Sequence, residues 1–248
     1  MMKKENTNLK LISDNPSFAY EEAYKSLRTN VSFLLNQNGG KIIMITSAVP
    51  GEGKTNVSLN LALSFADAGK RVLLIDCDLR KGTLQRSLKM NRAEGVSTIE
   101  DKSWNAQKAI VKADGFDFMP AGHTTSDTMH LLDSHAFQHM LHSVAEDYDY
   151  VICDTPPVNA VTDASIIAQY VDGILLVVSH NQVSKENVSA AKKQLENVDA
   201  NILGVVLNKY DAKHDGHENG YYYYYYNNYY AYGEGQKKKK KSFLKKRR

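Results

Sequence analysis

Six short apolar runs recur along the middle of this chain, and helix-length segments separate most of them. Within a run the apolar residues do not alternate with polar ones, so both faces of each predicted strand are buried. Such strands, separated by helices, are typical of a parallel sheet covered by helices on both sides. We therefore predict a doubly wound, mostly parallel α/β fold over residues 40–210. The runs are residues 42–45, 72–75, 116–119, 150–153, 174–178 and 202–207.

Two further segments flank this domain. Residues 1–39 form an N-terminal arm with apolar residues at helical spacing, and we expect an amphipathic helix from residue 16 to about residue 35. Residues 211–248 hold nine tyrosines within positions 221–232, followed by a lysine-rich end. Because this composition offers little apolar surface to bury, we expect a disordered tail.

Charge is distributed unevenly over the chain. The formal net charge is +3, but residues 233–248 carry nine basic residues and one acid, which leaves 22 basic and 27 acidic residues elsewhere. An acidic body disfavours a nucleic-acid-binding protein. The longest aliphatic run, residues 174–178, is far shorter than the roughly 20 residues of a membrane span, and the N-terminus lacks a secretory-signal pattern. We therefore expect a cytoplasmic protein that binds no nucleic acid.

The loop after the first run fits the pattern of a phosphate-binding loop, with Ala48 in place of the usual first glycine. Glycines let backbone N–H groups converge on phosphate oxygens, Lys54 meets the β- and γ-phosphates, and the Thr55 hydroxyl binds Mg²⁺. The alternative is a glycine turn with a chance Gly-Lys-Thr sequence. We expect the following residues to contact the nucleotide: Pro50, Gly51, Glu52, Gly53, Lys54, Thr55 and Asn56.

Carboxylates follow two other predicted strands. Asp76 and Asp78 come after the second run, and Asp154 ends the fourth. Open parallel sheets bind ligands at the carboxyl ends of their strands, so these side chains are predicted to face the phosphates. One carboxylate can bind Mg²⁺ while another orients or deprotonates an attacking hydroxyl. The alternative for each aspartate, taken alone, is a strand-end turn or a helix cap.

Taken together, these motifs resemble the Walker A, A′ and B motifs of the bacterial tyrosine kinases. The matching segments are residues 50–55, Asp76-x-Asp78-x-Arg80 and Asp154-Thr155-Pro156-Pro157, and the resemblance covers roughly residues 17–235. That family is similar in fold to the partitioning and septum-placement ATPases, which are P-loop NTPases. The resemblance implies the cofactors ATP and Mg²⁺, with Asp78 and Asp154 serving the metal.

The resemblance also implies an activity. It is ATP-dependent autophosphorylation of tail tyrosines, in control of capsular or exopolysaccharide synthesis and export. Asp76 would accept the tyrosine proton, although spacing alone does not choose between Asp76 and Asp78. Arg80 and Asn208 would contact the nucleotide. The expected acceptors are Tyr221, Tyr222, Tyr223, Tyr224, Tyr225, Tyr226, Tyr229, Tyr230 and Tyr232, and the alternatives are Tyr20, Tyr24 and Tyr210.

Several partners are implied in the same way. The family pairs with a transmembrane polysaccharide co-polymerase, here expected on a separate chain that activates the kinase at the inner face of the plasma membrane, and with a tyrosine phosphatase. A ring-like homo-oligomer is expected through Glu22, Lys25 and Arg28, where the family commonly has Glu-x-x-Arg-x-x-Arg. Lysine cannot pair in a bidentate manner as arginine does. The alternative is a solvated helix face with Glu21 and Lys25 paired.

The lysine-rich end has two interpretations. Residues 237–241 and 245–248 are either a solvated charge run or an electrostatic contact with anionic lipid that tyrosine phosphorylation releases.

Two rival functions remain open. The residues Asn208-Lys209-Tyr210-Asp211 match the guanine-reading motif of GTPases. A switch ATPase that binds a membrane or a partner without phosphorylating tyrosine is the other rival, but it has no use for nine clustered tyrosines. The two cysteines, Cys77 and Cys153, are expected to be reduced, buried thiols, with a metal or disulfide role as the alternative.

Overall fold

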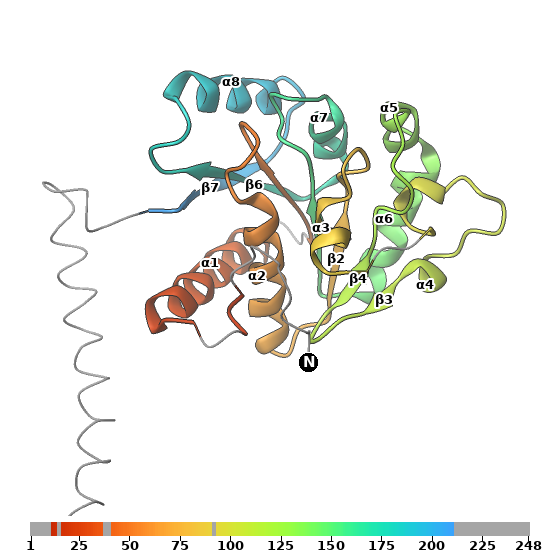
Figure 1. Ribbon diagram of the computed structural model, residues 1–248, viewed down its shortest axis with the longest axis horizontal. Helices are drawn as coiled ribbons and strands as arrows, with labels where there is room; N and C mark the ends of the chain where they lie inside the picture. Colours follow the sequence, from red (N-terminus) through yellow and green to blue (C-terminus); the bar gives the residue numbers. More distant parts are fainter. Residues whose placement is uncertain (1–10, 14–15, 37–40, 91–92, 211–248) are drawn as a thin grey trace, which may run out of the picture. The chain divides into compact units, whose positions relative to one another are not determined.

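The structure, a computed structural model, describes residues 11–13, 16–36, 41–90 and 93–210. One seven-stranded sheet has the order β3-β4-β2-β5-β1-β6-β7 (Figure 1). All neighbouring strands are parallel except β3 and β4. The predicted doubly wound, mostly parallel α/β fold is therefore confirmed. The strands are β1 (Ile42–Ser47), β2 (Val72–Asp76), β3 (Val111–Lys112), β4 (Asp117–Met119), β5 (Tyr150–Asp154), β6 (Gly173–Ser179) and β7 (Ile202–Asn208).

Each of the six apolar runs coincides with a strand, although the third begins one residue before β4, and burial explains the lack of alternation in the central strands. Every residue of β1, β2 and β5, the three central strands, is buried. The edge strand β7 has no fully buried residue. The two-residue β3, which no apolar run indicated, pairs antiparallel with β4 at the opposite edge.

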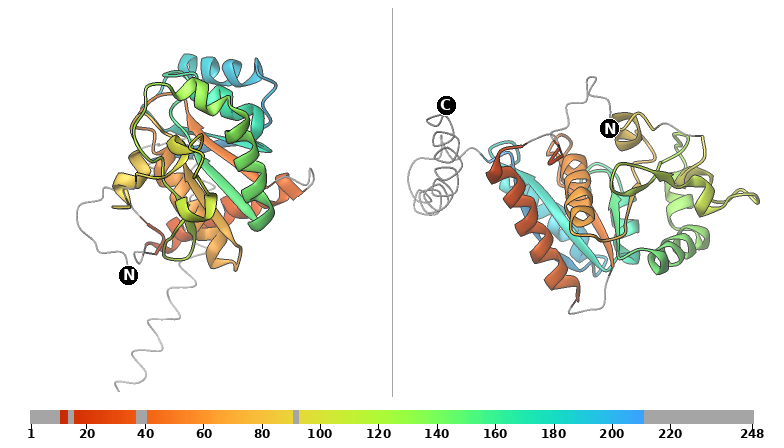
Figure 2. Two further views of the ribbon diagram at one scale, coloured as in Figure 1. Left: turned by 90° about the vertical axis from the view of Figure 1, so that its right-hand side faces the viewer. Right: turned by 90° about the horizontal axis from the view of Figure 1, so that it is seen from below.

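Helices α1 (Phe18–Asn36) and α2 (Lys54–Asp67) cover one face of the sheet (Figure 2). The predicted N-terminal helix is thus present, starting two residues after Pro16. Side chains of α1 and α2 form one hydrophobic core with alternate residues of the central strands, among them Ile43 and Ile152. Ten residues of α2 are buried, so this helix lies deep in the domain.

The other face carries a second core. Its strand residues include Met44 and Val151, which are sequence neighbours of the residues that face α2. Both faces of the sheet are therefore covered, as the fold class requires. The helices besides α1 and α2 are α3 (Thr83–Ser87), α4 (Ala106–Ala109), α5 (Thr128–Leu132), α6 (His135–Asp147), α7 (Asp163–Ile167) and α8 (Lys185–Glu196), with 3₁₀ turns η1 (Val96–Thr98) and η2 (Ala168–Tyr170).

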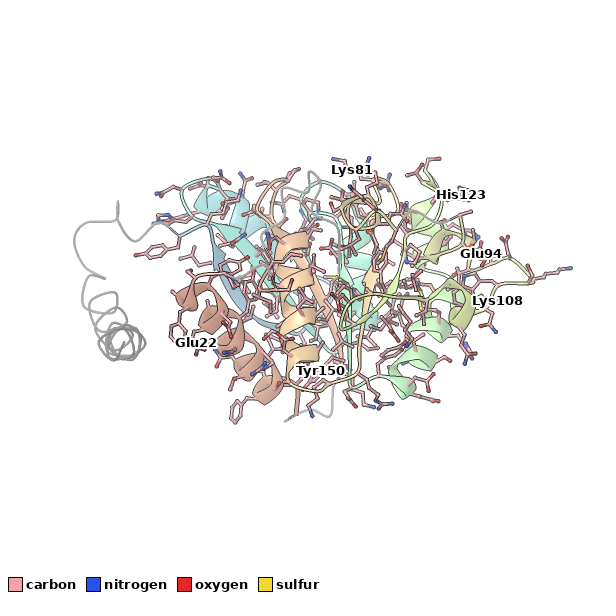
Figure 3. All side chains as sticks on the ribbon, turned by 60° about the horizontal axis from the view of Figure 1, so that its bottom comes forward. Glu22, Lys81, Glu94, Lys108, His123 and Tyr150 are labelled. Carbon is pink, nitrogen blue, oxygen red and sulfur yellow. The ribbon has the colours of Figure 1, made fainter. Side chains whose placement is uncertain are left out.

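The parallel strands bring their carboxyl ends to one edge of the sheet. Lys81, in the loop after β2, lies at this edge in Figure 3, and Tyr150, at the start of β5, lies at the opposite edge. The loops that carry the predicted motifs follow β1, β2 and β5, which are neighbours in the sheet. The fold therefore gathers the motifs at one place.

Both cysteines are free and buried, in agreement with the expectation. No helix within the described residues is long and apolar enough to cross a bilayer. The predicted disordered tail, residues 211–248, lies outside the described residues.

Candidate active site

The loop between β1 and α2 has the backbone of a phosphate-binding loop. Gly51 and Gly53 have φ angles of 85° and 92°, values that side-chain-bearing residues rarely adopt. Gly53 immediately precedes Lys54, the first residue of α2, so the loop ends at a helix N-terminus. No side chain caps this N-terminus. Its N–H groups and the helix dipole favour an anion at this position.

Lys54, Thr55 and Asp154 meet beside this loop. The Thr55 hydroxyl donates to Asp154 Oδ2 at 2.8 Å, and the Ser58 hydroxyl donates to Asp154 Oδ1 at 2.9 Å. Lys54 Nζ lies 3.4 Å from Thr55 Oγ1 and 4.0 Å from Asp78 Oδ2. Residues from all three predicted motifs therefore lie together: Thr55 is bonded to Asp154, and Lys54 is close to both Thr55 and Asp78.

Asp76 is held by backbone donors. Its Oδ1 accepts the N–H of Asp78 at 3.2 Å, and its Oδ2 accepts the N–H of Gln85 at 2.9 Å. Asp76 is fully buried and pairs in register with Asp154 across β2 and β5. Asp78 accepts the Lys81 N–H at 3.1 Å through Oδ1 and points Oδ2 towards Lys54. Asp76 and Asp78 thus have different surroundings although they are only two residues apart in sequence.

The proton affinities of these carboxyls follow from burial. Desolvation and the nearby Asp154 raise the pKa of Asp76 to about 7, against the opposing effect of its backbone hydrogen bonds. Burial also raises the pKa of Asp154, although Lys54 and the Thr55 and Ser58 hydroxyls oppose this shift. Near these three carboxyls lie the ammonium group of Lys54 and the guanidinium group of Arg80, which both interact with Asp78.

This donor set fits Mg²⁺. Thr55, Asp78 and Asp154 offer hard oxygen ligands, and Mg²⁺ normally binds one or two carboxylates together with water and phosphate oxygens. Among the described residues, no group of three or more His, Cys, Asp or Glu side chains could hold a metal by itself.

Four residues expected to contact the nucleotide have side chains bound to protein groups. The Glu52 carboxylate accepts two backbone N–H groups, the Asn56 side chain accepts the Tyr20 hydroxyl proton at 3.3 Å, and Asn208 Nδ2 donates to the Glu52 carbonyl oxygen at 2.8 Å. Arg80 forms a bidentate pair with Asp163 through bonds of 2.9 Å. In this structure these four side chains bind other protein groups and so help to fix the backbone around the site.

The three residues expected to mediate oligomerisation also have contacts within the chain. Lys25 pairs with Glu21 at 2.6 Å and with Glu22 at 2.9 Å, which is the pairing of the solvated-face alternative. Figure 3 places Glu22 on α1. Arg28 Nη1 donates to the Ser64 carbonyl oxygen at 2.6 Å and so joins α1 to α2. Their part in self-association stays a prediction.

Sequence reasoning missed Ser58, Gln85 and Asp163. Ser58 lies three residues after Thr55, a spacing that places both hydroxyls on one helix face, so this signal was available. Gln85 supplies a backbone N–H, which any residue other than proline would supply. Asp163 meets Arg80 across 83 positions of sequence, and no local pattern marks that pairing.

Comparisons with known proteins agree with this geometry. A family model described as an AAA domain matches residues 40–210. The chain is 36% identical over 209 residues to the tyrosine-protein kinase YwqD of Bacillus subtilis (strain 168), and the alignment covers 83% of this chain and 87% of that protein.

Solved structures give the same result. The kinase domain of the Escherichia coli tyrosine kinase ETK matches with a TM-score of 0.76 and 30% identity, covering 87% of this chain and 88% of that chain. The cell division ATPase MinD of Pyrococcus furiosus matches with a TM-score of 0.60 and 26% identity, covering 71% of this chain and 74% of that chain. This match bears out the expected likeness in fold to septum-placement ATPases.

The raised pKa of Asp76 predicts how stability changes with pH in the nucleotide-free and metal-free protein. The folded state keeps the Asp76 proton up to about pH 7, whereas the unfolded chain releases it near the ordinary value of 3.8, so stability falls as pH rises between these values. Asp76→Asn removes this titration and makes the decline shallower, while Asp154 still contributes. Chemical denaturation of both proteins across this interval measures the slopes, and identical slopes would contradict the assignment.

Proposed function

The chain belongs to the bacterial tyrosine-protein kinases, and from this membership we propose that it transfers the γ-phosphoryl group of ATP, with Mg²⁺, to tyrosines of its own C-terminal segment. The observation that carries the proposal is a second buried carboxyl, Asp76, which two backbone N–H groups hold in register with Asp154, beside the proposed metal ligands. A nucleotide switch needs only the loop and the metal. A kinase also needs a group that accepts the tyrosine proton.

Binding and charge stabilisation fall to the loop and Lys54. Backbone N–H groups at the start of α2 would hold phosphate oxygens, and Lys54 would neutralise charge on the β- and γ-phosphates. Thr55, Asp78 and Asp154 would hold Mg²⁺, which when bound neutralises the charge that develops on the phosphoryl oxygens. Thr55 and Asp154 already form a hydrogen bond, so two of these ligands are pre-organised.

The chemical step is an in-line displacement on phosphorus. The tyrosine hydroxyl gives its proton to Asp76, its oxygen forms a bond to the γ-phosphorus, and the bond to the bridging oxygen of ADP breaks. Each Asp76 oxygen accepts one N–H bond and keeps a second lone pair for this proton.

The tail tyrosines are the proposed acceptors. The strand β7 ends at Asn208, one residue later than the apolar run, so 12 residues lie between it and Tyr221. As a flexible coil these residues would span about 19 Å. Of the alternatives, Tyr24 is only 8% exposed and burial raises the pKa of its hydroxyl well above the ordinary value. Tyr20 donates its hydroxyl proton to Asn56. Both are therefore poor acceptors in the folded chain.

The cellular role follows from the family resemblance. We propose that the kinase controls capsular or exopolysaccharide synthesis and export, and that a transmembrane co-polymerase on a separate chain activates it at the inner face of the plasma membrane. A ring-like homo-oligomer and a tyrosine phosphatase complete the proposed system. The basic residues 237–241 and 245–248 would hold the unphosphorylated tail at anionic lipid until phosphotyrosine charge releases it.

Replacing the loop lysine tests the charge stabilisation. Lys54→Met should lower autophosphorylation by about 10²- to 10³-fold, because the transition state loses a cationic partner. Phosphotyrosine is measured by mass spectrometry after incubation with ATP and Mg²⁺. Lys108→Met on α4, labelled in Figure 3, is the matched control and should keep full activity. A folded Lys54→Met protein with undiminished phosphotyrosine would remove Lys54 from the mechanism.

Separate aspartate variants test the division of roles. Asp76→Asn should lose phosphoryl transfer while keeping nucleotide affinity, because the proton acceptor is gone but the metal ligands remain. Asp78→Asn should also raise the Mg²⁺ concentration needed for nucleotide binding. Magnesium titrations of nucleotide affinity in both variants provide the measurement. If the magnesium titration curves of the two variants coincide, Asp76 and Asp78 do not have the separate roles of base and metal ligand.

Truncation tests the acceptor segment. A chain ending at Gly220 should bind ATP normally and lose most of its phosphotyrosine. A full-length variant with the nine tail tyrosines changed to phenylalanine separates loss of the acceptors from loss of the lysine-rich end. If both proteins incorporate as much phosphate as the wild type, the acceptors lie elsewhere, and Tyr210 becomes the first candidate because it is 42% exposed.

A further inference from the structure

Glu52 is a buried acid inside the phosphate-binding loop. A carboxylate that faced a nucleotide here would repel its phosphates. In the structure only 1% of Glu52 is exposed, and the side chain is directed into the protein. A buried carboxylate requires hydrogen-bond donors, because its desolvation is costly.

Two backbone N–H groups supply these donors from distant parts of the chain. Glu52 Oε2 accepts the N–H of Val49 at 2.8 Å, within the same loop, and Oε1 accepts the N–H of Ser179 at 3.0 Å, 127 positions away. Ser179 is the last residue of β6. The Ser47 hydroxyl donates to the Val49 carbonyl oxygen at 2.9 Å, so both backbone groups of Val49 are fixed.

The main chain of the loop is fixed from the next strand as well. Asn208, the last residue of β7, donates from Nδ2 to the Glu52 carbonyl oxygen at 2.8 Å. A Cβ atom at Gly53 would come within 2.2 Å of the same Asn208 nitrogen, so the side chain lies against the loop backbone. The centre of the loop is therefore held by the ends of β6 and β7.

We propose that Glu52 is a positioning residue whose carboxylate holds the phosphate-binding loop in its nucleotide-binding conformation by joining Val49 to Ser179. A carboxylate fits this task because it accepts at both oxygens, whereas the amide of glutamine accepts at only one. The inference rests on the proposed nucleotide binding and assigns Glu52 no contact with the nucleotide. Its loss should therefore weaken nucleotide binding more than the chemical step.

Glu52→Gln in the full-length chain tests this role. The amide group must face one of the two N–H groups, so the loop should lose one anchor while keeping its volume. We expect the Kd for ADP with Mg²⁺, measured by calorimetry, and the KM for ATP to rise about tenfold, with kcat changed less than twofold. Glu94→Gln removes the same charge from an exposed residue labelled in Figure 3 and should leave these values unchanged.

The outcomes separate this inference from the proposed function. A wild-type chain that binds no nucleotide would overturn both. A Glu52→Gln protein with a lowered melting temperature but unchanged Kd and KM would give Glu52 a purely structural role and overturn the positioning role alone. Amide hydrogen exchange in the wild type covers the case of a variant that does not fold. Val49 and Ser179 should be protected and become more so with ADP, and fast exchange at both would overturn the inference.

Discussion

The buried carboxylate of Asp154 connects the three segments that form the site. It lies at the end of β5, between β2 and β1 in the sheet. Its two oxygens accept the hydroxyl protons of Thr55 and Ser58 from the first turns of α2, and its backbone oxygen accepts the N–H of Cys77 after β2 at 2.9 Å. The start of α2, which follows the phosphate-binding loop, and the segment after Asp76 therefore both contact Asp154. The register of β5 with β1 and β2 sets the spacing of the strand ends, and the Asp154 side chain adds the contacts to α2.

This arrangement concentrates negative charge before any ligand binds. Asp76, Asp78 and Asp154 lie close together, with the Lys54 ammonium group and the Arg80 guanidinium group as nearby cations, and burial amplifies the repulsion among the carboxylates. The excess is relieved either by protonation of Asp76 or by a divalent cation. With a cation bound, Asp76 would be ionised and able to accept a proton, so the proposed base and the proposed metal site depend on the same cluster of carboxylates. The same excess of negative charge explains why a site built for phosphoryl transfer costs the ligand-free protein stability.

The sequence was sufficient for the fold and for the positions of the main motifs. Apolar runs without alternation predicted the central strands because those strands are buried on both faces, and the strand ends placed Asp76 and Asp154 correctly. Side-chain direction was not predictable in the same way. Glu52 and Arg80 belong to matching motifs and Asn56 directly follows one. Their partners Ser179, Asp163 and Tyr20 nevertheless lie far away in sequence. Local patterns do not encode such pairings. The strand β3 was missed because its two residues, one half-buried and one exposed, leave no periodic signal.

Transfer of phosphate to tyrosine rather than to water distinguishes a kinase from a nucleotide switch with the same fold. The full-length chain, incubated with Mg²⁺ and ATP radiolabelled at the γ-phosphate, allows phosphotyrosine and free inorganic phosphate to be counted from the same reaction. A base at Asp76 that activates a tyrosine hydroxyl predicts that label appears on tyrosine from the earliest time points and exceeds the label released to water. Recovery of all the label as inorganic phosphate, with none on tyrosine, would contradict it.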